Sequence, residues 1–256
     1  MIDTPQNDYN VSTEARDLPY PLDQGQFLIE IEANGKTLAH TLRQPTLDDL
    51  TTRENLVVYE TEEIADGQDA VRADTERADA ALWDRIAVSV RGYRTATHSP
   101  EDTIEVTPEI AAKIPTAHKA TAIRGLYTST CEVEQSEDEG FNLDGELFTV
   151  RQELGKGETP DFIVRHILRQ PTEGERQEYR RKAAQTVLVR GAKRTKARVQ
   201  TNLKASVDLY DKCFVELSGA FTPETDRAKI LRQIDAMWKR QVIVALMQSF
   251  ESSLSD

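Results

Sequence analysis

The chain has 256 residues, a length that corresponds to one large domain or to two of ordinary size. Hydrophobic residues make up 38% and charged residues 30% of the sequence. Its longest apolar stretch, residues 242–247, is far shorter than the roughly 20 residues of a membrane-spanning helix. The formal charge of −12 disfavours binding of the whole molecule to nucleic acid or to an anionic membrane, because both would repel it.

Features of targeting and of disulfide scaffolds are missing from the sequence. The segment 1–5 has neither the basic leader nor the apolar stretch of a signal peptide. The two cysteines, Cys131 and Cys213, are too few for a disulfide scaffold or a thiolate zinc site. We therefore expect a protein that stays in the reducing compartment where it is made.

The sequence repeats itself. Residues 40–46 (HTLRQPT) and 166–172 (HILRQPT) are identical at six of seven positions. The segment 82–84 is echoed by 209–211, and Gly92 by Gly219. Apolar residues and a lysine near the end of each half also match, in the order Ile110, Ile114, Lys119, Ile123 and Leu126 against Ile230, Ile234, Lys239, Ile243 and Leu246. These matches predict two copies of one fold.

The predicted organisation has four parts. Residues 1–24 lack periodicity and contain several prolines, which predicts an extended arm that is disordered or laid against a partner. Repeat one covers 25–134 and repeat two covers 141–256. Between them, 135–140 belong to an acidic stretch with too little apolar content to pack, which is typical of a linker.

Each repeat is expected to open with a β-hairpin. In repeat one, apolar residues alternate over 27–31 and 38–42, and Asn34-Gly35 supplies the positive φ angles of a tight turn. In repeat two, residues 147–154 and 162–168 are the corresponding strands, around a looser loop at 155–157.

Helices are expected after each hairpin. Thr172 and Glu175 have the spacing of a capping box, and residues 46–49 form a weaker version. Further helices are indicated by apolar residues spaced three and four apart, namely Trp83, Ile86 and Val90 in repeat one and Leu209, Cys213 and Leu217 in repeat two. The last helix of each copy is expected to follow Thr107-Pro108 or Thr222-Pro223, with Pro115 dividing the first of them.

A hairpin followed by about three helices buries its apolar side only if the helices cover one face of the sheet. The predicted class is therefore α+β and mostly helical, with two tandem copies of a β-hairpin followed by about three helices.

Residues with catalytic or metal-binding patterns are scarce. No phosphate-binding glycine loop, nucleophile elbow or clustered Cys/His spacing is present, so we predict no catalytic residues, no metal site and no cofactor. His40 and His166 occupy equivalent positions three residues before an arginine. Local hydrogen bonding by each histidine is the favoured interpretation, and a metal shared between the repeats is the alternative.

Arg43 and Arg169 are the strongest single candidates for partner binding. Each guanidinium could grip a carboxylate of a partner or of the other repeat. Alternatively, each arginine fixes the corner between strand and helix by bonding carbonyl groups near Pro45 or Pro171. The second interpretation is favoured.

The two repeats differ in charge. Residues 47–80 carry eleven acidic and three basic side chains, whereas residues 173–207 carry three acidic and ten basic ones. Opposite charges on equivalent surfaces favour head-to-tail contact, either between the repeats or between molecules, that salt should weaken. The basic candidates for partner contact are Arg180, Arg181, Lys193 and Arg194. The basic stretch has only one aromatic residue, Tyr179, to stack bases, so nucleic-acid binding is not expected.

Residues 35–50 (GKTLAHTLRQPTLDDL) resemble the tail assembly chaperones of tailed bacteriophages, in which a short hairpin leads through a Leu-Arg-x-Pro turn into helices. Repeat two matches at 168–172 but has Gly174-Glu175 where the family has Asp-Leu. The resemblance covers about twenty-five residues in each repeat. It implies a non-enzymatic protein of the host cytoplasm that binds the helical tape measure protein during tail assembly.

An apolar stripe on the last predicted helix could accept such a helix, with Trp238 and Val242 as contact residues, although such stripes more often belong to a core. The alternative function is a structural component of a phage tail, neck or baseplate, located in the virion, which contacts its neighbours through its arm and its oppositely charged repeats. Both functions imply protein partners, and self-association is expected.

Overall fold

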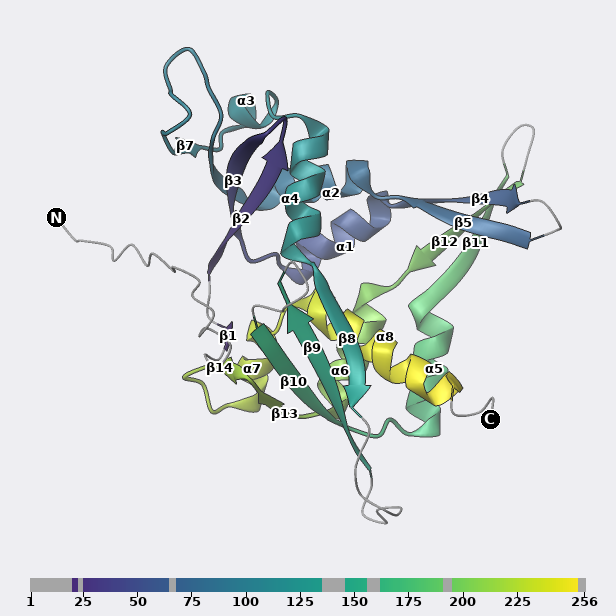
Figure 1. The fold of residues 1–256 in the computed structure, drawn as a ribbon. Coiled ribbons are helices and arrows are strands. Elements are labelled where there is room, and N and C mark those ends of the chain that lie inside the picture. Colours follow the sequence, from purple (N-terminus) through teal and green to yellow (C-terminus); the bar gives the residue numbers. More distant parts are fainter. Residues whose placement is uncertain are drawn as a thin grey trace.

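The computed structural model describes residues 20–22, 25–64, 68–134, 146–155, 162–190 and 195–252. Within these residues the chain forms eight helices and two four-stranded antiparallel sheets, together with three two-stranded pairings (Figure 1). The α+β class expected from the sequence is therefore confirmed.

Repeat one opens with the predicted hairpin, in which Asn34 and Gly35 adopt φ angles of 52° and 71° at the turn. Its elements, in order, are β2 (Gln26–Ala33), β3 (Lys36–Arg43), α1 (Leu47–Leu56), β4 (Val58–Ile64), β5 (Gln68–Asp74), α2 (Glu76–Ile86), β6 (Ala87–Arg91), β7 (Ile104–Glu105), α3 (Pro108–Ala111) and α4 (Thr116–Leu126).

Repeat two has the same elements in the same order. They are β9 (Leu147–Leu154), β10 (Phe162–Arg169), α5 (Glu173–Ala183), β11 (Ala184–Arg190), β12 (Thr195–Thr201), α6 (Leu203–Cys213), β13 (Phe214–Ser218), β14 (Ala220–Phe221), α7 (Arg227–Gln233) and α8 (Ala236–Ser252). The two tandem copies predicted from the sequence are thus present in the fold.

Two helix predictions were wrong in the same way. α2 ends at Ile86 and α6 at Cys213, so Val90 and Leu217 lie in β6 and β13 rather than in helices. In both repeats the strand follows the helix without a loop, and its apolar residues continue the helical spacing. The hairpins β4–β5 and β11–β12 were also not expected from the sequence.

Helix starts were predicted with mixed success. Thr46 forms a complete capping box with Asp49, and Thr107 caps α3 through its side chain. Pro115 separates α3 from α4 as expected. Thr222, however, does not begin a helix, because α7 starts after Asp226, whose carboxylate accepts hydrogen bonds from the amides of residues 228 and 229.

The sheets share three equivalent strands in the same order but differ at both edges. In repeat one the strand order is β2-β3-β6-β7, and in repeat two it is β13-β10-β9-β8. β8 (Ser129–Glu134) falls within the range assigned to repeat one, yet it pairs with β9 of repeat two. β1 (Tyr20–Pro21) likewise precedes repeat one and pairs in parallel with β14. These two segments therefore belong structurally to repeat two.

Each sheet packs its apolar face against helices and forms a core of its own. Leu42, Trp83 and Ile123 lie in the first core. Their equivalents in the second core are Leu168, Tyr210 and Ile243. The cores are also interlocked, because Leu203 and Val207 of α6 are buried in the core of repeat one.

Candidate functional site

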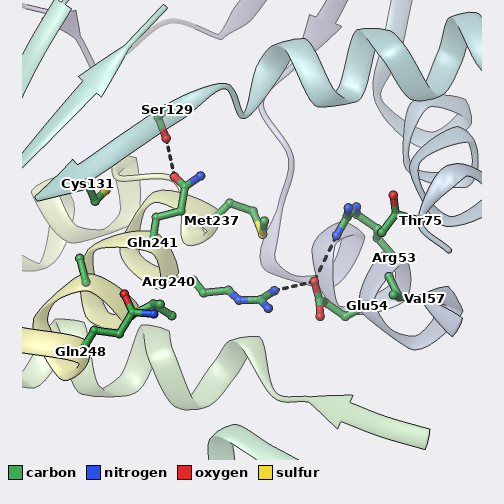
Figure 2. Close-up of a pocket in the computed structure, with 12 residues that line it drawn as sticks. Arg53, Glu54, Val57, Thr75, Ser129, Cys131, Met237, Arg240, Gln241 and Gln248 are labelled. Carbon is green, nitrogen blue, oxygen red and sulfur yellow. Dashed lines mark hydrogen bonds and ion pairs between the residues drawn. The ribbon is translucent and has the colours of Figure 1, made fainter. Parts of the chain in front are cut away.

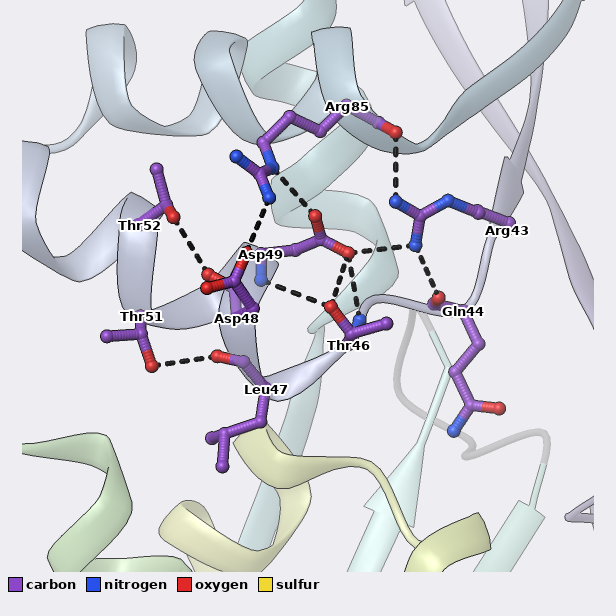
Figure 3. Close-up of polar contacts among 9 residues, drawn as sticks. All are labelled: Arg43, Gln44, Thr46, Leu47, Asp48, Asp49, Thr51, Thr52 and Arg85. Atoms are coloured by element: carbon purple, nitrogen blue, oxygen red, sulfur yellow. Dashed lines mark hydrogen bonds and ion pairs between the residues drawn. The ribbon is translucent and has the colours of Figure 1, made fainter.

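The corner between strand and helix in repeat one is held by Arg43 (Figure 3). Its guanidinium donates to the carbonyl oxygens of Gln44 and Arg85 at 3.1 and 3.0 Å, and it pairs with the Asp49 carboxylate at 2.8 Å. Asp49 also accepts hydrogen bonds from Thr46 and Arg85. Burial alone would raise the pKa of Asp49, but the donors around it outweigh burial and hold this pKa well below its usual range.

Repeat two has the same corner with a longer carboxylate. Arg169 donates to the Gln170 carbonyl at 3.0 Å and grips both oxygens of Glu175 at 2.8 and 2.7 Å. This contact lowers the pKa of Glu175 to about 2, and bonds from Thr172 add to the shift. Both arginines therefore fix the local fold, which confirms the interpretation favoured from the sequence.

The two equivalent histidines are buried and fully hydrogen-bonded. Trp83 Nε1 donates to His40 Nδ1 at 3.0 Å, and the Tyr93 hydroxyl lies 3.2 Å from His40 Nε2. In repeat two, the Tyr210 hydroxyl lies 2.7 Å from His166 Nδ1, and Gln152 occupies the other nitrogen at 3.0 Å. Burial lowers the pKa of His40 to about 4 and that of His166 to about 3, so both remain neutral near pH 7.

A buried lysine supports the ring that bonds each histidine. Lys119 pairs with Asp84 at 2.6 Å and lies 5.1 Å from the ring centroid of Trp83. Lys239 repeats this arrangement with Asp211 at 2.6 Å, and lies 5.6 Å from the ring of Tyr210. The matches found in the sequence thus mark a shared core architecture.

The remaining partner-binding candidates are not gathered into one site. Trp238 and Val242 are buried in the second core, so the prediction that they line an open groove was wrong. They occupy the side of α8 that packs inward. Arg180 and Arg181 are exposed on α5, while Lys193 and Arg194 lie outside the described residues.

The oppositely charged segments do meet at the level of the backbone. β4, in the acidic stretch of repeat one, lies beside β12, in the basic stretch of repeat two (Figure 1). Of the two contacts expected from the charges, between repeats or between molecules, this arrangement corresponds to the first.

A cleft lies at the boundary between the repeats (Figure 2). Its volume is about 480 Å³. One wall is α8, which turns residues spaced by three or four toward it. The other walls are the end of α1 with Thr75, and β8. The lining residues are Arg53, Glu54, Val57, Thr75, Ser129, Cys131, Met237, Arg240, Gln241, Val244, Ala245 and Gln248.

The charged groups of the cleft are paired with one another. Glu54 of repeat one accepts from Arg240 of repeat two at 2.7 Å and from Arg53 at 3.1 Å. Arg53 also pairs with the buried Asp79 at 2.6 Å. On the opposite side, the Ser129 hydroxyl donates to Gln241 at 2.8 Å. The contact between Glu54 and Arg240 joins the two repeats at the cleft.

The chemistry of the cleft is suited to binding. Burial raises the pKa of the Cys131 thiol to about 12, so the sulfur stays protonated and is a poor nucleophile at neutral pH. The apolar side chains are Val57, Met237, Val244 and Ala245. The cleft therefore combines apolar side chains with polar and charged ones, as protein interfaces do.

Sequence patterns could not reveal this cleft. Its residues come from four segments that lie far apart in the chain, and they do not match between the repeats. The signal closest to it was the apolar stripe of the last helix, but the opposite side of that helix faces the cleft.

Among the residues that the structure describes, no three His, Cys, Asp or Glu side chains are placed to hold a metal ion. No helix in the described ranges is long and apolar enough to cross a membrane. Comparisons with models of protein families, with curated proteins and with solved structures found no match.

Proposed function

We propose that the protein is a non-enzymatic binding protein of the phage tail assembly chaperone kind, which holds a helical segment of a partner such as the tape measure protein. The observation that carries this proposal is the cleft between the repeats, where α8 presents three partly exposed apolar residues along one wall. Arg43, Asp49 and the Pro-Thr turn, which carry the resemblance to these chaperones, supply the rigid corner from which α1 reaches the cleft.

A helix would bind through two kinds of contact. Val244 is 37% exposed on α8, and Met237 and Ala245 are half-buried beside it, so an apolar helix face gains contact without opening the core. The exposed Gln248 offers hydrogen bonds to polar groups of the same helix. Because Trp238 and Val242 are inside, this surface replaces the groove inferred from the sequence.

The environments of the histidine and cysteine side chains, which could act in catalysis, favour a binding role instead. His40 and His166 have both ring nitrogens occupied by neighbouring side chains. The other thiol, that of Cys213, has its pKa raised to about 11 by burial. Each of these groups is used to build the fold.

Site-specific photocrosslinking tests this function. A benzophenone amino acid at position 244 should crosslink to a helical segment of a tail protein in cells that assemble the particle. The same group at Leu147, which is 56% exposed on β9, serves as the control. Equal crosslinking from both positions would contradict helix capture in the cleft.

Mass spectrometry of purified particles separates this function from a structural role. A chaperone should be absent from mature particles. Stoichiometric presence would instead support a component of the tail, neck or baseplate.

A further inference from the structure

The outer edges of the two sheets are equivalent in position but not in occupancy. In repeat two, β8 pairs with the outer edge of β9. In repeat one, no strand among the described residues pairs with the outer edge of β2, the equivalent strand. The pairing of β8 with β9 therefore indicates that the edge of β2 could accept a strand in the same way.

The backbone groups along this edge can be assigned. The amide of Gln44 donates to the Gly25 carbonyl at 3.2 Å, and hydrogen-bonded pairs alternate along an antiparallel ladder. The amides and carbonyls of Leu28, Glu30 and Glu32 consequently point away from β3. Their equivalents in β9, which are Thr149, Arg151 and Glu153, are the residues opposite β8.

α4, the helix that packs under β2, also has an exposed side next to this edge. α8 packs against β8, where Gln241 bonds Ser129 and Val244 lines the cleft with Cys131. The corresponding residues of α4 are Thr121 and Arg124, and both are exposed. An added strand would therefore lie over α4 as β8 lies over α8.

Charge indicates what kind of strand fits. In sheet two, Glu132 of β8 lies opposite Arg151, and Glu134 pairs with Arg165 at 2.9 Å. An acidic strand thus meets arginines at the occupied edge. At the β2 edge, Glu30 takes the place of Arg151, and Ala39 takes that of Arg165. Both arginines are therefore replaced there, and Glu30 lies between Glu32 and Leu28, which is 62% exposed. Cross-strand pairs of opposite charge stabilise a sheet, whereas like charges destabilise it.

We propose that the outer edge of β2 binds an extended strand of a partner protein, antiparallel to β2, with basic residues opposite Glu30 and Glu32 and an apolar residue opposite Leu28. Backbone hydrogen bonds supply affinity, and the alternating side chains supply selectivity. This strand site is separate from the helix-binding cleft, and it stands or falls independently of the proposed function.

A peptide derived from β8 provides the probe. It comprises residues 127–134 with Thr130→Lys, Cys131→Ser, Glu132→Lys and Glu134→Val, which places lysines opposite Glu30 and Glu32. The control peptide carries only Cys131→Ser. Fluorescence anisotropy with the full chain should show about tenfold tighter binding of the basic peptide. The double variant Glu30→Lys/Glu32→Lys should reverse this preference.

Backbone methylation of the peptide distinguishes strand pairing from simple charge attraction without altering the protein. The amides of residues 130 and 132 would face β2, so N-methylation at both should abolish binding. N-methylation at 131 and 133 should leave binding within about twofold, because those amides face away.

Amide hydrogen exchange locates the bound peptide. Binding should slow exchange at Leu28, Glu30 and Glu32. Protection confined to the cleft, equal affinity of the two peptides, or equal effects of the two methylation patterns would overturn the proposal. Binding that appears only after residues 1–19 are deleted would also overturn it, because the chain itself would then occupy the edge.

Discussion

Trp83 and Tyr210 hold the same position in the two repeats, each bonded to the Nδ1 atom of a buried histidine, at 3.0 and 2.7 Å respectively. An indole and a phenol perform the same task here because either can place a polar hydrogen at the edge of an aromatic ring. The two repeats therefore share the hydrogen bond to histidine, although the residue that makes it differs.

Removing this contact should destabilise the repeat that contains it. Tyr210→Phe deletes only the hydroxyl and leaves a buried ring nitrogen of His166 without its partner. We expect a loss of about 1–3 kcal/mol in the free energy of unfolding, measured by chemical denaturation. A loss below about 0.5 kcal/mol would show that the bond contributes little.

The arginine corners should depend on geometry as well as on charge. Arg169→Lys keeps the positive charge but cannot grip both oxygens of Glu175 while bonding the Gln170 carbonyl. We expect a loss of about 1–2 kcal/mol in unfolding free energy. Arg181→Lys, on the exposed side of α5, is the matched control and should change stability by less than about 0.5 kcal/mol.

Acid should weaken the corner of repeat two. The pKa of Glu175 is about 2 in the folded protein, below its ordinary value, so the contact stabilises the fold above pH of about 4.5 and is lost as pH falls toward 2. Glu175→Gln should flatten this part of the stability profile, measured by urea denaturation at a series of pH values. An unchanged acid slope would show that Glu175 titrates alike in both states.

Gly92 and Gly219 should resist substitution. Both have positive φ, and an added Cβ would lie 2.8 Å from the Thr37 carbonyl oxygen at Gly92 and would clash with the Ile163 carbonyl at Gly219. We expect Gly219→Ala to cost more than about 2 kcal/mol in thermal or chemical unfolding. Gly174→Ala is the control, because its Cβ meets open space in α5 and should stabilise the helix by about 0.5–1 kcal/mol.

Asp235 should reduce stability at neutral pH. It is buried at the start of α8, where it accepts from the amide of Met237, and burial raises its pKa to about 6. Because the folded protein binds this proton more tightly than the unfolded chain, its ionisation lowers stability as pH rises from about 4 to 6. Asp235→Asn should therefore gain up to about 3 kcal/mol relative to the parent as pH rises across this range. A difference independent of pH would contradict this expectation.

The sequence predicted what is repeated and missed what is unique. His40, Arg43 and Gly92 have matched partners in repeat two, and their shared spacing indicated the tandem architecture. Local chemistry likewise predicted the Asn34-Gly35 turn. The cleft, by contrast, depends on contacts such as Glu54 with Arg240, which join segments with no common pattern.

The second hairpins were missed for a different reason. β4–β5 and β11–β12 follow short helices, and the charge of their sequences resembled that of solvated helical stretches. The orientation of α8 could also not be predicted from the periodicity of its apolar residues alone. An apolar stripe identifies a buried side of a helix, but it does not say which neighbour covers that side or what the other side faces.

The pairing of β1 with β14 and of β8 with β9 gives the chain an unusual connectivity. Segments on both sides of repeat one are built into repeat two, so repeat one is, in effect, an insertion within its own duplicate. No single cut in the polypeptide separates two complete modules. A C-terminal fragment beginning after Glu134 would lack both borrowed strands, so the duplicated halves are no longer interchangeable parts.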